Sequence, residues 1–139
     1  MPLSDFLRDE VIKHMHRTGS WTKPTTLAVC LCSSAPVSSD TGALTGKELA
    51  NTLGYARQTL NPLDANWTAP GGGHTTSNSS LIAFTPSGTW AAATHVAITD
   101  SATYGAGNLL WFAPLQSAQI GSSDDPLEFA AGDLSYGPT

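Results

Sequence analysis

Basic side chains are scarce in this sequence and absent from its second half. The chain has 6 Lys and Arg among 139 residues, and the last of them is Arg57. Every Asp and Glu beyond that point lacks a basic counterpart nearby in sequence, and the net charge is -5. Such a surface repels phosphate backbones and anionic lipid headgroups, so we expect no binding to nucleic acid or to a membrane.

Long apolar runs and charge in general are also lacking. No stretch approaches the roughly 18 apolar residues that cross a bilayer. Residues 1–21 have neither a basic start nor an uninterrupted apolar core, so we expect no signal peptide. Charged residues make up 12% of the chain, about half the usual share, and small polar residues take their place. This composition favours β structure with broad protein contacts.

Cysteine is limited to Cys30 and Cys32. They are two positions apart in a strand-like run, so both side chains point to one face and are poorly placed to bond to each other. We expect them to be reduced and buried, in a protein made in a cytoplasm.

One amphipathic helix is predicted within residues 1–18. Apolar residues recur there at helical spacing and form one stripe: Leu3, Phe6, Leu7, Val11, Ile12 and Met15. Ser4 is the expected N-cap, and Gly19 is the expected left-handed stop. The stripe either packs on the chain's own sheet or docks on a partner.

After this helix the pattern changes to the two-residue period of strands. Runs bounded by Gly, Pro, Asn and Asp predict strands at 26–32, 54–60, 66–68, 80–85, 94–99, 109–113, 127–130 and 134–136. The runs 94–99 and 109–113 should form an antiparallel pair, and 38–53 should be a loop with a helical turn at 47–53. We therefore predict a mostly β single domain over residues 1–139, a jelly-roll-like antiparallel sandwich of about seven or eight strands.

Catalytic, cofactor and metal patterns each fail on spacing or geometry. The run Gly42–Glu48 has too few residues between its glycines for a phosphate loop, and a carboxylate replaces the Mg²⁺-binding hydroxyl. His14 and His16 point roughly 200° apart on a helix, so they share no zinc ion with the cysteines. No nucleophile-elbow pattern surrounds any serine. We expect no enzyme activity, no cofactor and no metal.

The four tryptophans suggest one different function. Trp111 lies in an apolar strand and is expected in the core. Trp21, Trp67 and Trp90 neighbour loops, where an exposed aromatic ring can stack on a sugar. A carbohydrate-binding module is therefore an alternative.

Four sequence blocks resemble small virion proteins of tailed phages. They are residues 3–7 with 21–36, the block Gly54–Gln58, residues 78–110, and residues 129–134. Some members of this family are labelled tail-fibre proteins, and others are capsid cement (decoration) proteins that form a jelly roll on an HK97-type shell. The resemblance implies a structural role in a virion.

Two physical arguments favour the cement function as the main hypothesis. Long fibres need repeats or coiled coils, which this sequence lacks, whereas a cement protein needs a compact body with weak contacts made in many copies. The expected partners are a second copy, preferably in a dimer, and the major capsid protein on the outer capsid surface. A tail or tail-fibre component is the alternative. The expected interface residues are the helix stripe together with Asp124, Asp125 and Glu128.

Overall fold

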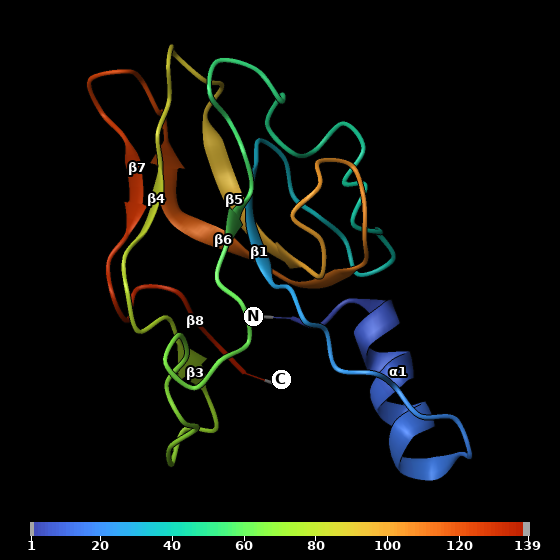
Figure 1. The fold of residues 1–139 in the computed structure, drawn as a ribbon. Coiled ribbons are helices and arrows are strands. Elements are labelled where there is room, and N and C mark those ends of the chain that lie inside the picture. Colours follow the sequence, from blue (N-terminus) through green and yellow to red (C-terminus); the bar gives the residue numbers. More distant parts are fainter. Residues whose placement is uncertain (1, 138–139) are drawn as a thin grey trace.

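A computed structural model describes residues 2–137 as a β body from which one helix projects (Figure 1). The helix α1 spans Asp5–His16. The eight strands are β1 (Ala28–Cys32), β2 (Gln58–Thr59), β3 (Thr76–Ser77), β4 (Ile82–Phe84), β5 (Ala93–Thr99), β6 (Leu109–Gln119), β7 (Leu127–Phe129) and β8 (Ser135–Tyr136). No helix in this part of the chain is long and apolar enough to cross a membrane.

The main sheet has four antiparallel strands in the order β2-β1-β5-β6. Its central strand β1 is buried on both faces, because successive side chains enter different clusters. Val29 and Leu31 join one core cluster with Val96 and Ile98 of β5. The cysteines lie on the opposite face in a second cluster.

Two short ribbons cover one face of this sheet. Strand β3 pairs with β8, and β4 pairs with β7, both antiparallel. Ile82 and Phe84 of β4 and Tyr136 of β8 belong to the same core cluster as Val29 and Leu31. The opposite face is covered by Leu44 and the loop around it.

The predicted fold class is confirmed, since the chain is mostly β, antiparallel, and preceded by one helix. The antiparallel pairing of 94–99 with 109–113 is also confirmed, although β6 extends six residues further, to Gln119. One large sheet with two ribbons is consistent with a jelly roll. Both cysteines are free and buried, as expected.

Four local predictions are wrong. The predicted strand 66–68 is not formed, since only Trp67 makes an isolated bridge there, with Asn78. Residues 47–53 form no helical turn, because Glu48 instead pairs with Cys32 in an isolated β-bridge. Of the predicted strand 54–60, only Gln58–Thr59 is a strand. The helix ends at His16 with Arg17 in an extended conformation, so Gly19 does not provide its stop.

Candidate interaction surface

Ser4 attaches helix α1 to the main sheet. Its backbone N–H donates to the Leu110 carbonyl at 2.9 Å, and its hydroxyl donates to the Leu109 carbonyl. The same hydroxyl accepts from the Leu7 N–H at 3.1 Å, which is the N-cap bond predicted from the sequence. One fully buried side chain therefore both starts the helix and holds it against β6.

The segment before the helix also pairs with the edge of β6. Leu3 forms an isolated antiparallel bridge with Trp111, and the Phe112 N–H donates to the Pro2 carbonyl at 3.4 Å. Leu3 and Phe6 are half-buried as a result. These two predicted interface residues are therefore partly used within the chain.

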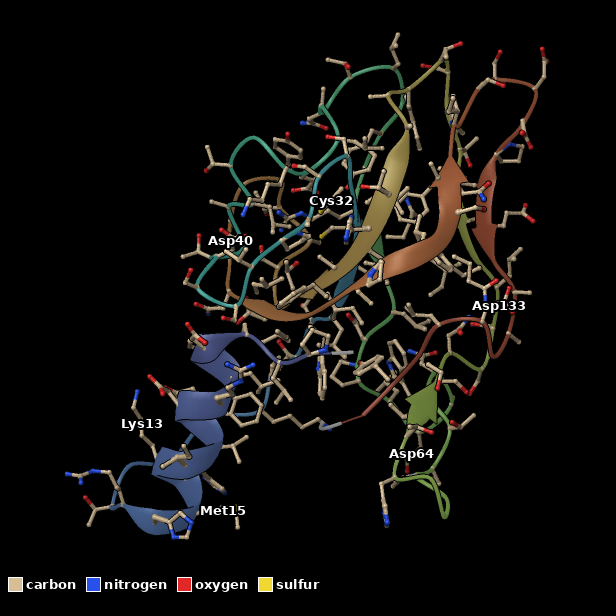
Figure 2. The ribbon with its side chains drawn as sticks, turned by 180° about the vertical axis from the view of Figure 1, so that it is seen from behind. Lys13, Met15, Cys32, Asp40, Asp64 and Asp133 are labelled. Atoms are coloured by element: carbon tan, nitrogen blue, oxygen red, sulfur yellow. The ribbon has the colours of Figure 1, made fainter. Side chains whose placement is uncertain are left out.

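The rest of the apolar stripe leaves the body. Leu7 is only 5% exposed, whereas the exposure is 38% at Val11, 55% at Ile12 and 69% at Met15. Figure 2 shows Met15 near the outer end of the projecting helix. The first turn thus packs on the chain's own sheet. In the later turns the Trp21 N–H donates to His14 Nδ1 at 3.3 Å, but the apolar side chains of Ile12 and Met15 stay mostly exposed. We call α1 together with Arg17 the helical arm.

The outer end of the arm is basic. Near its base, Arg8 pairs with Asp5 at 3.0 Å, and one turn further Lys13 pairs with Glu10 at 3.0 Å. These exposed i,i+3 pairs contribute little to stability. Arg17 pairs with no carboxylate of the described residues. Arg17 therefore gives the tip a positive charge that no carboxylate of the described residues neutralises.

Asp124, Asp125 and Glu128, the predicted acidic interface residues, are exposed at the β7 side of the body. Asp125 closes a tight turn through two backbone hydrogen bonds with Ser122, at 3.0 and 3.1 Å. Strand β7 lies across the body from α1 (Figure 1). The structure therefore gathers the acidic residues but separates them from the helix stripe.

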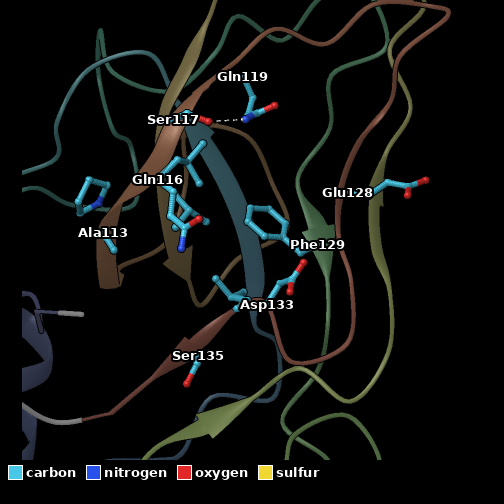
Figure 3. A pocket seen from close by; sticks show the side chains of 12 residues that line it. Ala113, Gln116, Ser117, Gln119, Glu128, Phe129, Asp133 and Ser135 are labelled. Carbon is cyan, nitrogen blue, oxygen red and sulfur yellow. Dashed lines mark hydrogen bonds between the residues drawn. The ribbon is translucent and has the colours of Figure 1, made fainter.

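A groove runs between β6 and β7, which belong to different sheets. Its volume is about 470 Å³. The most deeply buried lining residues are Val96 and Leu134 at its base, with Leu115 and Phe129 half-buried above them. In Figure 3 the Phe129 ring points from β7 into this gap, toward β6. The β6–β7 groove thus exposes part of the core to a ligand or partner.

The rim of the β6–β7 groove is polar and acidic. Gln116 of β6, Glu128 of β7 and Asp133 all line it and are exposed. A smaller hollow of about 240 Å³ shares the residues Leu115 and Glu128 and continues the groove to Asp125. No Lys or Arg lines either hollow.

The most deeply buried polar site is an ion pair between Arg57 and Glu48. The Arg57 Nε and Nη2 atoms donate to the two carboxylate oxygens of Glu48 at 2.9 and 2.7 Å. Both side chains are at most 1% exposed. A fork-to-fork geometry of this kind is the strongest form of such a pair.

Further hydrogen bonds from Arg57 connect two loops to this pair. Nη2 donates to the Gly42 carbonyl at 2.6 Å, and Nη1 donates to the carbonyls of Ser101 and Ala106, both at 3.0 Å. Gly42 packs so closely on Gly107 that a Cβ atom would overlap the backbone there. Arg57 therefore holds the loop before Glu48 against the loop between β5 and β6.

Tyr55 completes this buried cluster. Its hydroxyl donates to Glu48 Oε1 at 2.8 Å and accepts from the Leu31 N–H at 3.0 Å. Burial, with the nearby carboxylate, raises the pKa of Tyr55. Burial alone would lower the pKa of Arg57, but its hydrogen bonds to Glu48 and the surrounding negative charge leave it above its ordinary value. Arg57 therefore stays protonated and Tyr55 stays neutral as a donor, and the cluster acts as a structural brace.

No sequence pattern predicts this brace. Glu48 was considered only as the residue that spoils a phosphate loop, and Arg57 only as the last basic residue. One signal was available, because Tyr55 and Arg57 lie in the block Gly54–Gln58, which carries the family resemblance most specifically. An isolated Arg inside a strand-like run is a reason to look for a buried carboxylate.

One of the four tryptophans is buried and the other three are half-buried. Trp90 is buried and donates its indole N–H to the Leu53 carbonyl at 2.8 Å. Trp67 donates to the Leu60 carbonyl at 3.0 Å. Trp67, Trp111 and Trp21 are half-buried, so none of the four offers a fully exposed stacking face. The prediction that Trp111 packs with the core is confirmed, since it borders the main cluster.

The two thiols are inaccessible and poorly ionised. Burial raises the pKa of Cys32 to about 12 and raises the pKa of Cys30 as well. Each side chain is 0% exposed. A nucleophilic cysteine needs the opposite properties, a lowered pKa and an approach from solvent.

Comparison with known proteins identifies the family to which the chain belongs. No curated protein matches the chain. A protein-family model described as podophage GP4 fiber I protein gp80 matches residues 2–137. This description supports the phage-virion resemblance and is closer to its fibre alternative than to capsid cement. The chain belongs to the family of phage structural proteins described as podophage GP4 fiber I protein gp80.

Proposed function

We propose that this protein is a compact structural component of a podophage tail fibre. The observation that carries the proposal is the family match over residues 2–137, whose description names a fibre protein. The capsid-cement hypothesis is argued from the lack of repeats and coiled coils and from a compact body with weak contacts in many copies, and a short fibre component shares these properties. The proposed location is therefore the tail of the virion.

The shape of the chain suggests which part of a fibre it forms. A long shaft is built from repeats or coiled coils. The described residues instead hold one 12-residue helix and strands of 2 to 11 residues around a common core. We therefore assign the protein to a compact unit, such as a joint or an attachment point, and not to an extended shaft.

The helical arm is the surface that we propose for attachment. Ile12 and Met15 are more than half exposed on a helix that is held rigidly at its base by Ser4. Covering such exposed apolar side chains with a partner is energetically favourable, because it removes apolar surface from water. Fibres are present in several copies, so each contact can be weak.

We propose that this role is non-catalytic. No buried side-chain N or O atom of residues 2–137 lacks a hydrogen-bond partner, so no interior polar group is held ready for a substrate. The Arg57–Glu48 cluster is sealed from solvent. A sugar-binding role would have to rely on half-buried tryptophans.

Electron microscopy of intact phage particles tests the proposed location. We expect density of this fold on the tail, and loss of that density in particles that lack the protein. Density on the capsid lattice would overturn the fibre proposal and support the cement hypothesis. Absence of the protein from particles would contradict both.

A pair of variants tests the role of the arm in the particle. Met15→Ser, at the arm tip, should reduce incorporation of the protein into particles. Leu63→Ser is the matched control, because Leu63 is 60% exposed on the body. Equal incorporation of both variants would contradict attachment through the arm.

A further inference from the structure

We propose that the helical arm of one copy docks in the β6–β7 groove of a second copy. This inference deepens the proposed function, because it names the partner of the arm. The proposed contact joins two surfaces that each expose apolar side chains in the single chain. One is an apolar helix face that leaves the body, and the other is an opening in the side of the core.

The apolar parts of the two surfaces complement each other. The arm presents Ile12 and Met15, which are 55% and 69% exposed. The groove of about 470 Å³ is lined at its base by buried core residues and higher up by Leu115 and Phe129. A flexible Met side chain adapts well to an irregular apolar opening of this kind. Docking would remove apolar surface from water on both copies.

The charges of the two surfaces are also complementary. At the arm tip Arg17 has no ion-pair partner among residues 2–137, whereas Lys13 is already paired with Glu10 at 3.0 Å. The groove rim carries Glu128 and Asp133, and neither lining includes Lys or Arg. All Lys and Arg beyond the arm lie at or before Arg57, whereas the groove is built from residues after it, apart from Leu31 in the smaller hollow. Charge opposition of this kind steers docking and sets its orientation.

The arm cannot reach its own groove. Figure 2 shows Lys13 and Met15 at one lower end of the molecule and Asp133 on the opposite side of the β body. Ser4 holds the base of the arm against β6 through two hydrogen bonds, to the carbonyls of Leu109 and Leu110. The contact must therefore form between copies.

Because the contact joins two different surfaces, its symmetry decides which oligomer forms. Two copies that exchange arms reciprocally form a closed dimer, and a repeated one-way contact forms a ring or an open chain. In either case a residue of the arm meets a residue of the groove, and arm never meets arm. This distinction gives the sharpest test.

Disulfide trapping tests the contact on the purified full-length chain. Met15→Cys and Gln116→Cys are made as separate chains, with the buried Cys30 and Cys32 left in place as unreactive thiols. A disulfide requires the two Cα atoms to lie within about 7 Å. We expect mixed chains to give a covalent Met15→Cys/Gln116→Cys product on mild oxidation, well above the yield of either chain alone.

Other trapping results overturn the proposal. A Met15→Cys chain that cross-links to itself as efficiently as to the Gln116→Cys chain would show arm-to-arm pairing. No cross-link at any concentration, together with a monomer by sedimentation, would exclude self-docking. The fibre proposal would be unaffected by either result, because its own test is the position of the protein in the particle.

Charge reversal gives an independent readout of the same contact. Arg17→Glu and Glu128→Lys should each weaken self-association roughly tenfold in sedimentation equilibrium. The double variant Arg17→Glu/Glu128→Lys should return to within a few-fold of the original chain. Lys23→Glu, outside the arm, and Asp64→Lys, on another part of the body, are the matched controls. A double variant no better than the single ones would contradict the proposed pairing.

Discussion

Arg57 and Arg17 carry the same guanidinium group in opposite environments. Arg57 makes six hydrogen bonds inside the β body, two of them to Glu48. Arg17 follows the last turn of the arm and pairs with no carboxylate of the described residues. The comparison separates two uses of charge, because the buried group stabilises the fold and the exposed group remains available to another molecule.

The apolar side chains show the same contrast between the buried β body and the exposed arm. Phe84, Leu31 and Ile98 are 0% exposed in the main core, whereas Met15 of the arm is 69% exposed. Burial of a large apolar side chain contributes about 1.5–3 kcal/mol to folding, and an exposed one contributes little. Substitutions in the body should therefore change stability, and substitutions at the arm tip should change association.

The largest effect is expected for Arg57→Met. Removing the guanidinium leaves the Glu48 carboxylate buried without its ion partner, which should cost about 3–5 kcal/mol of unfolding free energy. Urea denaturation measures this loss. Adding Glu48→Leu to Arg57→Met should recover part of it, because the buried charge is then gone. A change below about 1 kcal/mol in Arg57→Met would contradict the brace.

The second largest effect is expected at high pH, which should lower the stability of the same β body. Cys32 has its pKa raised by burial from 9.0 to about 12, and burial raises the pKa values of Cys30, Tyr55 and Tyr136 too. A raised folded pKa means that stability is intact below pH 9 and falls between pH 9 and 12. The fall should approach about 1.4 kcal/mol per pH unit for each group that ionises only on unfolding.

Chemical denaturation at pH 8, 9, 10 and 11 measures this fall. The thiols should also resist alkylation in the folded chain and react on unfolding. Stability that rises across this range, or thiols that react while the fold is intact, would contradict the burial of these groups.

A smaller effect is expected where the two regions meet. Ser4→Ala removes the N-cap of α1 and the hydroxyl bond to the Leu109 carbonyl, which should cost about 1–2 kcal/mol. Helix content by circular dichroism and denaturation together measure this change. Ser4→Thr, which keeps a hydroxyl, is the control. An unchanged helix signal would show that Ser4 does not hold the arm.

The smallest stability effect is expected at the arm tip. Ile12→Ser and Met15→Ser should each change the unfolding free energy by less than about 0.5 kcal/mol, since their side chains are mostly exposed. Leu7→Ser, buried on the same stripe, is the contrasting variant and should destabilise clearly. If all three variants destabilise equally, the arm is packed along its whole length and the comparison fails.

Local pattern predicted much of the fold. The two-residue alternation correctly identified 94–99 as a strand, and the structure places Val96 and Ile98 in one core cluster and Ala97 in the other. Ser4 was recognisable as an N-cap because its side chain acts on the nearby Leu7 N–H. Predictions of this kind succeed when the interacting groups are close in sequence.

Long-range predictions were weaker for the same reason. The tertiary structure places Glu48 in a β-bridge with Cys32 and in an ion pair with Arg57. The helical turn predicted at 47–53 therefore does not form. Periodicity identified the apolar stripe of α1 but could not tell which of its turns touch the body. The β6–β7 groove depends on two strands that fail to pair, which no local pattern encodes.

The sequence by itself determined the mostly β class, the N-terminal helix with its cap, the reduced cysteines and the confinement of Lys and Arg to positions up to Arg57. These follow from spacing and composition, which act over a few residues or over the whole chain. Tertiary structure alone decided that Arg57 is buried and Arg17 exposed, and that the arm and the acidic groove lie on opposite sides of the body. Those outcomes depend on which distant segments pack together, because burial is a property of the packed chain.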